Sequence, residues 1–296
     1  MMEQSDVIRN SPDVMQRISM NMDKLTKSQQ RVADYIQNHT MEAAFSTVDR
    51  TAHAVDVSTT TVVRLALSLG YSGYAEMQSA LKDYMTVMSS PIHMFSIVTR
   101  SEEDAGRAAD YTSLMELEIQ NIQETCSAIV TETVNKAADA LSNARSIFVI
   151  GARTSEAPAR YFAYNLDRMF LNTQYVFADT NHVPELVNRM GKEDVLIYIV
   201  NSRYLRSVYE ATRAAKLTGA TVIGLIDAVS NTWIPFTDYT FYCANRSANF
   251  FHSPVSAMFI ANVLMKQCVN TNRERVESNL KKLEESVQSL KLFLKN

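Results

Sequence analysis

Between residues 12 and 88, apolar residues recur at intervals of three and four, which is the spacing of one face of an α-helix. This pattern predicts an all-α unit over 12–88, preceded by a flexible leader over 1–11. Thr26 and Gln29 have the spacing of a capping box, so a helix is expected to begin at Thr26. Further helices are expected from near residue 12, over 41–45 and over 75–87.

The stretch 49–70 predicts two short helices joined by a tight turn. The turn falls at residues 56–57, and Ser58 stands where its hydroxyl can accept the free amide protons of the second helix. That helix is expected over 59–69. Gly70 follows it directly and suits a left-handed C-cap.

The second helix of this pair has two distinct faces. Its inward positions are apolar and recur at helical spacing: Val62, Leu65 and Leu69. Its outward positions carry small hydroxyls and one guanidinium: Thr59, Thr60 and Arg64. Small side chains let a helix approach base edges, and Arg can bond guanine or phosphate, so the pair has the layout of a helix-turn-helix that reads the DNA major groove. An ordinary helical hairpin in a bundle fits the same periodicity.

From residue 146 onward, short apolar runs alternate with helical segments. The expected strands are 146–150, 175–177, 195–200, 221–226 and 239–243. The expected helices are 157–170, 183–190, 206–217 and 253–269. Apolar strands that alternate with helices indicate a parallel sheet covered on both faces, so this part is predicted to be a doubly wound α/β domain.

A break in the pattern predicts a linker over 89–103, after which the α/β domain spans 104–270 and begins with two helices. A C-terminal helix is expected over 271–296. Its apolar residues form a seam with coiled-coil spacing: Val276, Leu280, Leu283, Val287, Leu290 and Leu294. The seam fits a dimer contact, which is the preferred interpretation, or packing against its own domain.

Length and composition support this two-domain organisation. A chain of 296 residues suits about two domains, and 46% hydrophobic residues excludes wholesale disorder. No apolar run approaches the roughly 20 residues of a membrane span, and the polar first residues do not fit a secretory signal, so a cytoplasmic protein is expected. Cys126, Cys243 and Cys268 lack metal-ligand spacing and are expected to be reduced thiols, with no metal or cofactor.

The charge balance does not favour DNA binding. The chain has a formal net charge of −3, and residues 1–90 contain eight basic residues against ten acidic ones. A nucleic-acid-binding domain often carries a basic surplus. Any DNA affinity must therefore come from the local placement of a few cations and from two DNA-binding units acting together.

Two strand-to-helix joints are candidate ligand sites, because open α/β sheets bind ligands at the carboxyl ends of their strands. The first joint, after the strand at 146–150, contains Gly151, Arg153 and Ser155. The second contains Ser202 and Arg203. Each joint combines a helix N-terminus with a hydroxyl and a guanidinium, which predicts recognition of a phosphate or carboxylate. Ordinary loops with solvent-exposed arginines would give the same pattern.

Catalysis has little support in the sequence. The chain contains no GxSxG elbow, HExxH motif or P-loop, and we assign no catalytic residue. A sugar isomerase would need a base near the substrate carbonyl. Between Asp238 and Glu274 there is no Asp or Glu, and His252 is the only imidazole there.

The order of these parts resembles the RpiR-type bacterial transcriptional regulators, which pair an N-terminal helix-turn-helix domain with a C-terminal sugar isomerase (SIS) domain. The likeness lies in LTKSQQRVADYI at 25–36, VSTTTVVRLALSLGYSGYAEMQ at 57–78 and a SIS-like run over 146–269. It implies a DNA-binding regulator of carbohydrate-metabolism genes, a dimer or tetramer, with a phosphosugar as effector. The residues expected to contact DNA are Lys27, Ser58, Thr59, Thr60, Thr61, Arg64, Tyr71 and Tyr74.

Both effector loops depart from the family pattern. The first, usually GxGxS, keeps Gly151 and Ser155 but has Arg153 in place of the second glycine. The second, usually SxSGxT, keeps only Ser202 and has Arg203 in place of the glycine. The two arginines could hold an anion other than the usual phosphosugar, or they could fill the site. A dimerisation module without an effector and a sugar-phosphate isomerase remain the alternatives.

Overall fold

The structure is a computed structural model that describes residues 12–88, 90, 92, 95, 111–179, 182–227 and 233–293. The predicted leader and nearly all of the predicted linker lie outside these residues. The chain divides into a helical N-terminal unit and a larger C-terminal unit, with the boundary after His93.

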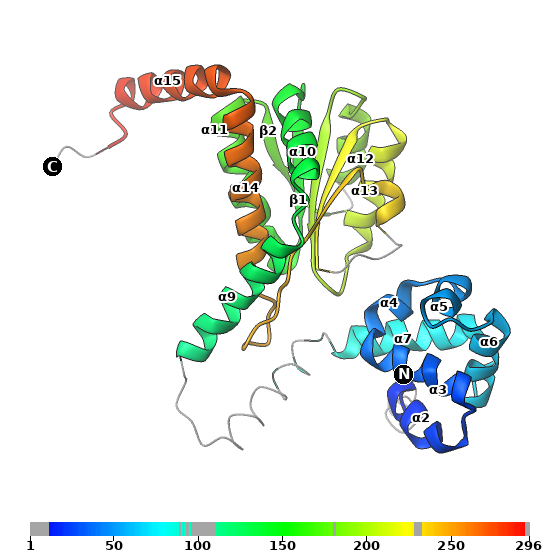
Figure 1. Cartoon of the computed structure of the whole chain (residues 1–296). Helices are drawn as coiled ribbons and strands as arrows, with labels where there is room; N and C mark the ends of the chain where they lie inside the picture. Colours follow the sequence, from blue (N-terminus) through cyan, green and yellow to red (C-terminus); the bar gives the residue numbers. More distant parts are fainter. Residues whose placement is uncertain are drawn as a thin grey trace, which may run out of the picture. The chain divides into compact units, whose positions relative to one another are not determined.

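The N-terminal unit consists of short helices around one apolar core (Figure 1). In chain order they are α2 (Val14–Asn21), η1 (Met22–Lys24), α3 (Lys27–Asn38), α4 (Thr40–Phe45), α5 (Val48–Ala54), α6 (Thr59–Ser68) and α7 (Tyr74–Met88). The capping box at Thr26 and Gln29 is confirmed, with the Gln29 amide 3.4 Å from the Thr26 hydroxyl. Val62 and Leu65 are 0% exposed and Leu69 is 3% exposed, so the inward face predicted for α6 is confirmed.

The C-terminal unit is built on a five-stranded parallel sheet with the order β2-β1-β3-β4-β5 (Figure 1). The strands are β1 (Ile147–Gly151), β2 (Thr173–Val176), β3 (Val195–Val200), β4 (Thr221–Ile226) and β5 (Tyr239–Tyr242). The helices are α9 (Tyr111–Ser127), α10 (Thr131–Asn143), η2 (Arg153–Ser155), α11 (Glu156–Phe170), α12 (His182–Arg189), α13 (Arg206–Leu217), η3 (Ile234–Phe236), α14 (Val255–Thr271) and α15 (Arg273–Ser289). The predicted fold, an all-α domain followed by a doubly wound α/β domain, is confirmed.

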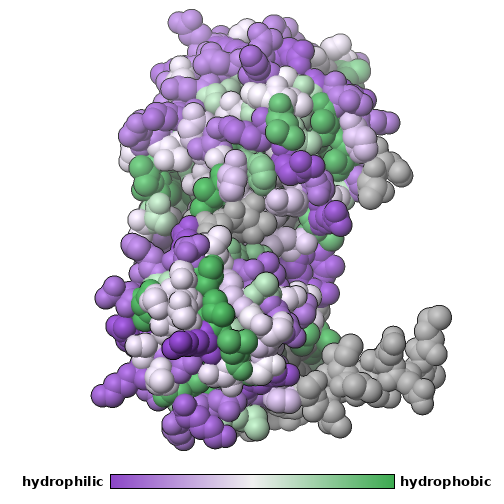
Figure 2. All heavy atoms as spheres, turned by 90° about the vertical axis from the view of Figure 1, so that its right-hand side faces the viewer, coloured by the Kyte–Doolittle hydropathy of each residue, from purple (hydrophilic) through white to green (hydrophobic). Residues whose placement is uncertain are grey.

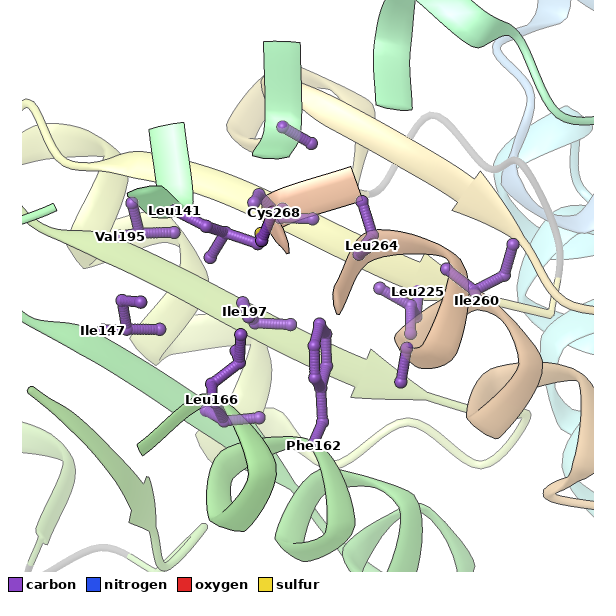
Figure 3. Close-up of a cluster of buried hydrophobic side chains, with 14 of the residues drawn as sticks. Leu141, Ile147, Phe162, Leu166, Val195, Ile197, Leu225, Ile260, Leu264 and Cys268 are labelled. Carbon is purple, nitrogen blue, oxygen red and sulfur yellow. The ribbon is translucent and has the colours of Figure 1, made fainter. Parts of the chain in front are cut away.

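Helices cover both faces of this sheet. On one face, residues of α10, α11 and α14 close over the alternate residues of β1, β3 and β4. Figure 3 shows this cluster, in which Leu141, Phe162 and Leu264 lie over the strand residues. On the other face, α12 and α13 pack on the remaining strand residues through Leu186 and Val208. Because both faces are buried, β1 and β3 are apolar along their whole length, as the sequence indicated.

The apolar residues of the C-terminal seam lie in two different environments. Its first part packs against its own unit: Val276 is 4% exposed, and the Asn279 amide donates to the Met169 carbonyl at 3.0 Å. Farther along, Leu280 on α15 is 42% exposed and Leu290, just after the helix, is 67% exposed. Leu283 and Val287 are partly exposed, and Leu294 lies outside the described residues. The dimer contact stays a prediction for this exposed part.

Candidate DNA interface and effector site

The joint between α5 and α6 is held by local bonds. Asp56 adopts the left-handed conformation with φ 52°, which aspartate tolerates better than most residues. The next amide, of Val57, donates to the Ala52 carbonyl at 3.0 Å. From α3, the Arg31 guanidinium donates to the Asp56 carbonyl at 3.1 Å. These contacts set the angle at which α6 leaves the turn.

The N-terminus of α6 is capped by Ser58. The Ser58 hydroxyl accepts from the Thr61 amide at 3.2 Å, and it lies 2.9 Å from the Thr61 hydroxyl. Of the predicted DNA contacts, these two residues therefore use their hydroxyls within the helix cap. Thr59, Thr60 and Arg64 are exposed on the outer face, as the periodicity indicated.

The three predicted backbone contacts lie in different environments. Lys27 is exposed at the start of α3. Tyr71 is only 8% exposed, and the guanidinium of Arg17 lies 4.8 Å from the centre of its ring. The Tyr74 hydroxyl lies 2.8 Å from the Thr51 hydroxyl and donates to a backbone carbonyl of the loop between α4 and α5. Their DNA contacts stay predictions, and the Tyr74 hydroxyl is already bonded inside the unit.

The positions of the basic side chains matter for DNA binding because the N-terminal unit carries more acidic than basic residues. Cations surround α6 even though acids outnumber bases: Arg17 donates to the Leu69 carbonyl at its end, and Arg31 binds the turn at its beginning. Arg64 stands on its outer face. A count of charges along the sequence could not reveal this arrangement, because helices far apart in the chain supply the cations.

In the α/β unit, Gly151 allows α11 to begin close to the end of β1. A Cβ at this position would lie 2.5 Å from the Ser155 carbonyl oxygen and 2.8 Å from the Ala159 side chain. The loop therefore requires glycine for space. The Tyr175 hydroxyl on the neighbouring strand donates to the Gly151 carbonyl at 3.0 Å, which fixes this end of β1.

The two predicted ligand loops border one pocket at the carboxyl ends of β1 and β3. Ser155 and Arg153 line it from the first loop, and Ser202 and Arg203 from the second. Both arginines are exposed, and within the described part of the chain neither guanidinium forms a hydrogen bond or ion pair. Both also have left-handed backbones, with φ 57° at Arg153 and 67° at Arg203. The glycines that the family places there would adopt this conformation without strain.

Beside Arg203, Ser202 belongs to a polar network that joins the ends of β3 and β4. Its amide donates to the Asp227 carboxylate at 2.6 Å, and its hydroxyl lies 2.7 Å from Nε2 of His252. The Tyr204 hydroxyl donates to the other Asp227 oxygen at 2.8 Å. Asn245 completes the group, with its amide 3.4 Å from Asp227.

Burial shifts the pKa values of two groups in this network. It raises the pKa of the Asp227 carboxyl, against the hydrogen bonds from Tyr204 and Ser202 that favour the charged form. It lowers the pKa of His252, although the negative charge of Asp227 acts in the opposite direction. A neutral imidazole can accept a hydrogen bond from the Ser202 hydroxyl at Nε2, and a bound anion would compete for the same hydroxyl.

The sequence interpretation missed Asp227 and treated His252 as an isolated imidazole. Asp227 follows an apolar strand directly, so the strand-end rule that selected Ser202 could have selected it too. The gap between Asp238 and Glu274, which is the sequence's argument against an isomerase, does not leave His252 without carboxylates nearby. Residues outside that gap supply them, because β4 ends beside the segment that contains His252.

The segment before α14 also binds α9, the first described helix of this unit. The Ser253 hydroxyl donates to the Glu118 carboxylate at 2.6 Å, and the Asn121 amide donates to the Arg246 carbonyl at 2.7 Å. The Ala244 amide donates to the Thr125 hydroxyl at 2.9 Å. The segment that carries His252 is therefore bonded on one side to the candidate ligand site and on the other to α9.

Other kinds of site find little support in the described residues. They contain no group of three His, Cys, Asp or Glu side chains arranged to hold a metal ion. Cys126 is an exposed free thiol, whereas Cys243 and Cys268 are buried. None of the described helices is long and apolar enough to cross a membrane.

Two family models match the two units. Residues 13–87 match the helix-turn-helix domain of the rpiR family, and residues 140–266 match the SIS domain. YbbH of Bacillus subtilis, an uncharacterised HTH-type transcriptional regulator, is 24% identical over 91% of this chain and 95% of its own length. The HTH-type transcriptional regulator HexR of Pseudomonas aeruginosa is 26% identical over 74% of each chain.

Solved structures share the fold. The NanR protein of Vibrio vulnificus, complexed with ManNAc-6P, is 21% identical, with a TM-score of 0.63 over 94% of this chain and 99% of that one. The sugar isomerase domain of an RpiR transcription factor from Sphaerobacter thermophilus is 20% identical, with a TM-score of 0.56 over 59% of this chain and 97% of that one. Domain order, fold and relatives agree: the chain belongs to the RpiR family of helix-turn-helix transcriptional regulators that carry a SIS domain.

Proposed function

We propose that this regulator controls carbohydrate-metabolism genes and that its SIS domain senses a small anionic metabolite, a sugar phosphate or a sugar acid. The observation that carries the proposal is the pair of unbonded guanidiniums, Arg153 and Arg203, beside the hydroxyls of Ser155 and Ser202. Arg holds phosphate and carboxylate through paired hydrogen bonds. The structural relative NanR was solved with ManNAc-6P, which supports a sugar phosphate.

DNA binding is assigned to the outer face of α6, with Thr59, Thr60 and Arg64 toward the bases. Lys27 contacts the phosphate backbone. With few cations in each unit, operator affinity requires two units, so the working form is a homodimer or a tetramer made of two such dimers. Its operator then contains two half-sites separated by one helical turn of DNA or a multiple of it.

The ligand acts by binding the DNA-competent and incompetent arrangements unequally. An anion that takes the Ser202 hydroxyl displaces its bond to His252. The segment that carries His252 is bonded to α9 through Glu118 and Asn121. Since the chain runs from the DNA-binding unit into α9, this segment is the proposed route from effector to DNA.

The test is fluorescence anisotropy of the full-length protein on DNA from upstream of its own and neighbouring genes. A shuffled fragment and two salt concentrations are the controls, because phosphate contacts release counterions and weaken with salt. Sugar phosphates, sugar acids and inorganic phosphate are then screened for a change in DNA affinity. Arg153→Ala should abolish the response. Arg213→Ala, on the outer side of α13, is the matched control and should keep it.

A second candidate function follows from the bond between Ser202 and His252. A neutral imidazole is a competent base, so a sugar-phosphate isomerase remains the alternative. We propose that the site binds its ligand without turnover, in line with relatives named as transcriptional regulators. An aldose–ketose interconversion assay on every sugar phosphate that alters DNA binding separates the two functions.

A further inference from the structure

The outer face of α6 consists of five residues on one side of the helix: Thr59, Thr60, Val63, Arg64 and Leu67. Two of them are aliphatic. A DNA groove that receives this face therefore meets apolar groups as well as hydrogen-bonding groups.

Leu67 is 52% exposed, although its neighbours on the inner face, Val62 and Leu65, are fully buried. Within the described part of the unit, neither Leu67 nor Val63 belongs to the apolar core or packs against it. The core therefore does not require an aliphatic residue at 67. A single exposed leucine is ordinary, but this one lies on the face that carries Thr60 and Arg64.

Figure 2 looks from the side on which α6 lies in Figure 1. On this side of the helical unit, green apolar atoms form a strip between purple hydrophilic ones. The two aliphatic side chains that α6 adds to this side, Val63 and Leu67, would be buried favourably against an apolar group of the DNA. In the major groove, the base edges present donors, acceptors and one apolar group, the 5-methyl of thymine.

We propose that Leu67, with Val63 beside it, determines operator specificity by contacting thymine 5-methyl groups, while Arg64 bonds a neighbouring guanine or phosphate. The inference rests on the proposed function, because it requires α6 to enter the major groove. Each half-site then contains a thymine opposite Leu67. Replacing that thymine by cytosine removes the methyl group and changes the pattern of donors and acceptors.

The experiment begins with a duplex that the full-length protein selects from a randomised pool. Thymines in one half-site are replaced by deoxyuridine one at a time, which removes only the 5-methyl group. At one or two positions, wild-type binding should weaken about fourfold, the effect of losing one buried methyl contact. Leu67→Ala should bind the thymine duplex about as weakly as the wild type binds the deoxyuridine duplex. Its affinity should no longer respond to deoxyuridine at that position.

Met20→Ala is the matched control, because Met20 is an apolar residue that is 70% exposed on a different helix of the same unit, α2. It should keep both affinity and deoxyuridine sensitivity, and circular dichroism should show that both variants are folded. Selective binding that ignores every deoxyuridine substitution overturns the methyl contact alone. Full sensitivity in Leu67→Ala overturns the assignment to Leu67. Failure to select any duplex overturns this inference together with the proposed DNA-binding role of α6.

Discussion

Replacing Arg153 and Arg203 with glycine should make the protein more stable while it loses anion binding. Both residues have left-handed backbones, and neither side chain forms a bond within the described residues. The left-handed conformation costs an L-residue about 1–2 kcal/mol, and glycine removes this cost. Glycine also gives the unfolded chain more conformational entropy, which lowers the stability by about 0.4–1 kcal/mol. The net gain is about 0.5–1 kcal/mol per site.

For both sites together the gain is about 1–2 kcal/mol, which corresponds to a rise in Tm of about 2–8 °C for a unit of this size. Differential scanning calorimetry of the full-length double variant Arg153→Gly/Arg203→Gly measures it. The same variant is tested for its DNA-binding response to sugar phosphates and sugar acids. We expect a higher Tm for the α/β unit together with a lost response.

Two controls separate strain from charge. Arg153→Ala/Arg203→Ala removes the same guanidiniums but keeps a Cβ at both left-handed positions, so it should lose the response without the gain in Tm. Leu171, with φ 59° and 51% exposure, lies outside the pocket, so Leu171→Gly should raise Tm and keep the response. If the glycine variant melts no higher than the alanine variant, the strain argument is wrong. If it keeps the response, the arginines do not bind the ligand.

Three further predictions concern DNA contacts, protonation and coupling. Arg64→Ala should weaken binding to the selected DNA by about 1–3 kcal/mol. Lys27→Ala should weaken binding to all DNA sequences alike and reduce the slope of log affinity against log salt by about 1, as anisotropy titrations at several salt concentrations would show. Because burial lowers the pKa of His252, its contribution to stability is present above the unfolded-state pKa of about 6.5 and is lost as pH falls below it. Urea unfolding of His252→Gln should therefore lose less stability than the wild type between about pH 6.5 and 5, and equal losses would contradict the assignment. Asn121→Ala should keep DNA and effector binding but diminish the effect of effector on DNA affinity. An unchanged effect would remove α9 from the route.

The sequence by itself determined the elements and most of the fold class. Helical spacing placed Val62 and Leu65 inside, and the capping box at Thr26 marked the start of α3. Continuous apolar runs identified the buried parallel strands. These features depend on residues close together in the chain, where a side chain's periodicity or hydrogen-bonding capacity can be evaluated without the rest of the molecule.

Only the tertiary structure decided how the candidate sites are assembled. Ser202, Asp227 and His252 follow one another at intervals of 25 residues. Ser202 and Asp227 meet because β3 and β4 are neighbours in the sheet, and the segment before α14 brings His252 to Ser202. The bond between the hydroxyls of Tyr74 and Thr51 also depends on how α7 packs, while the DNA contact of Tyr74 stays a prediction. The left-handed backbone of Arg153 does not follow from the residue itself, since arginine does not favour it, and the glycine that the family places there is the one sequence signal for it. Such features arise from contacts between segments distant in sequence, and no local pattern encodes them.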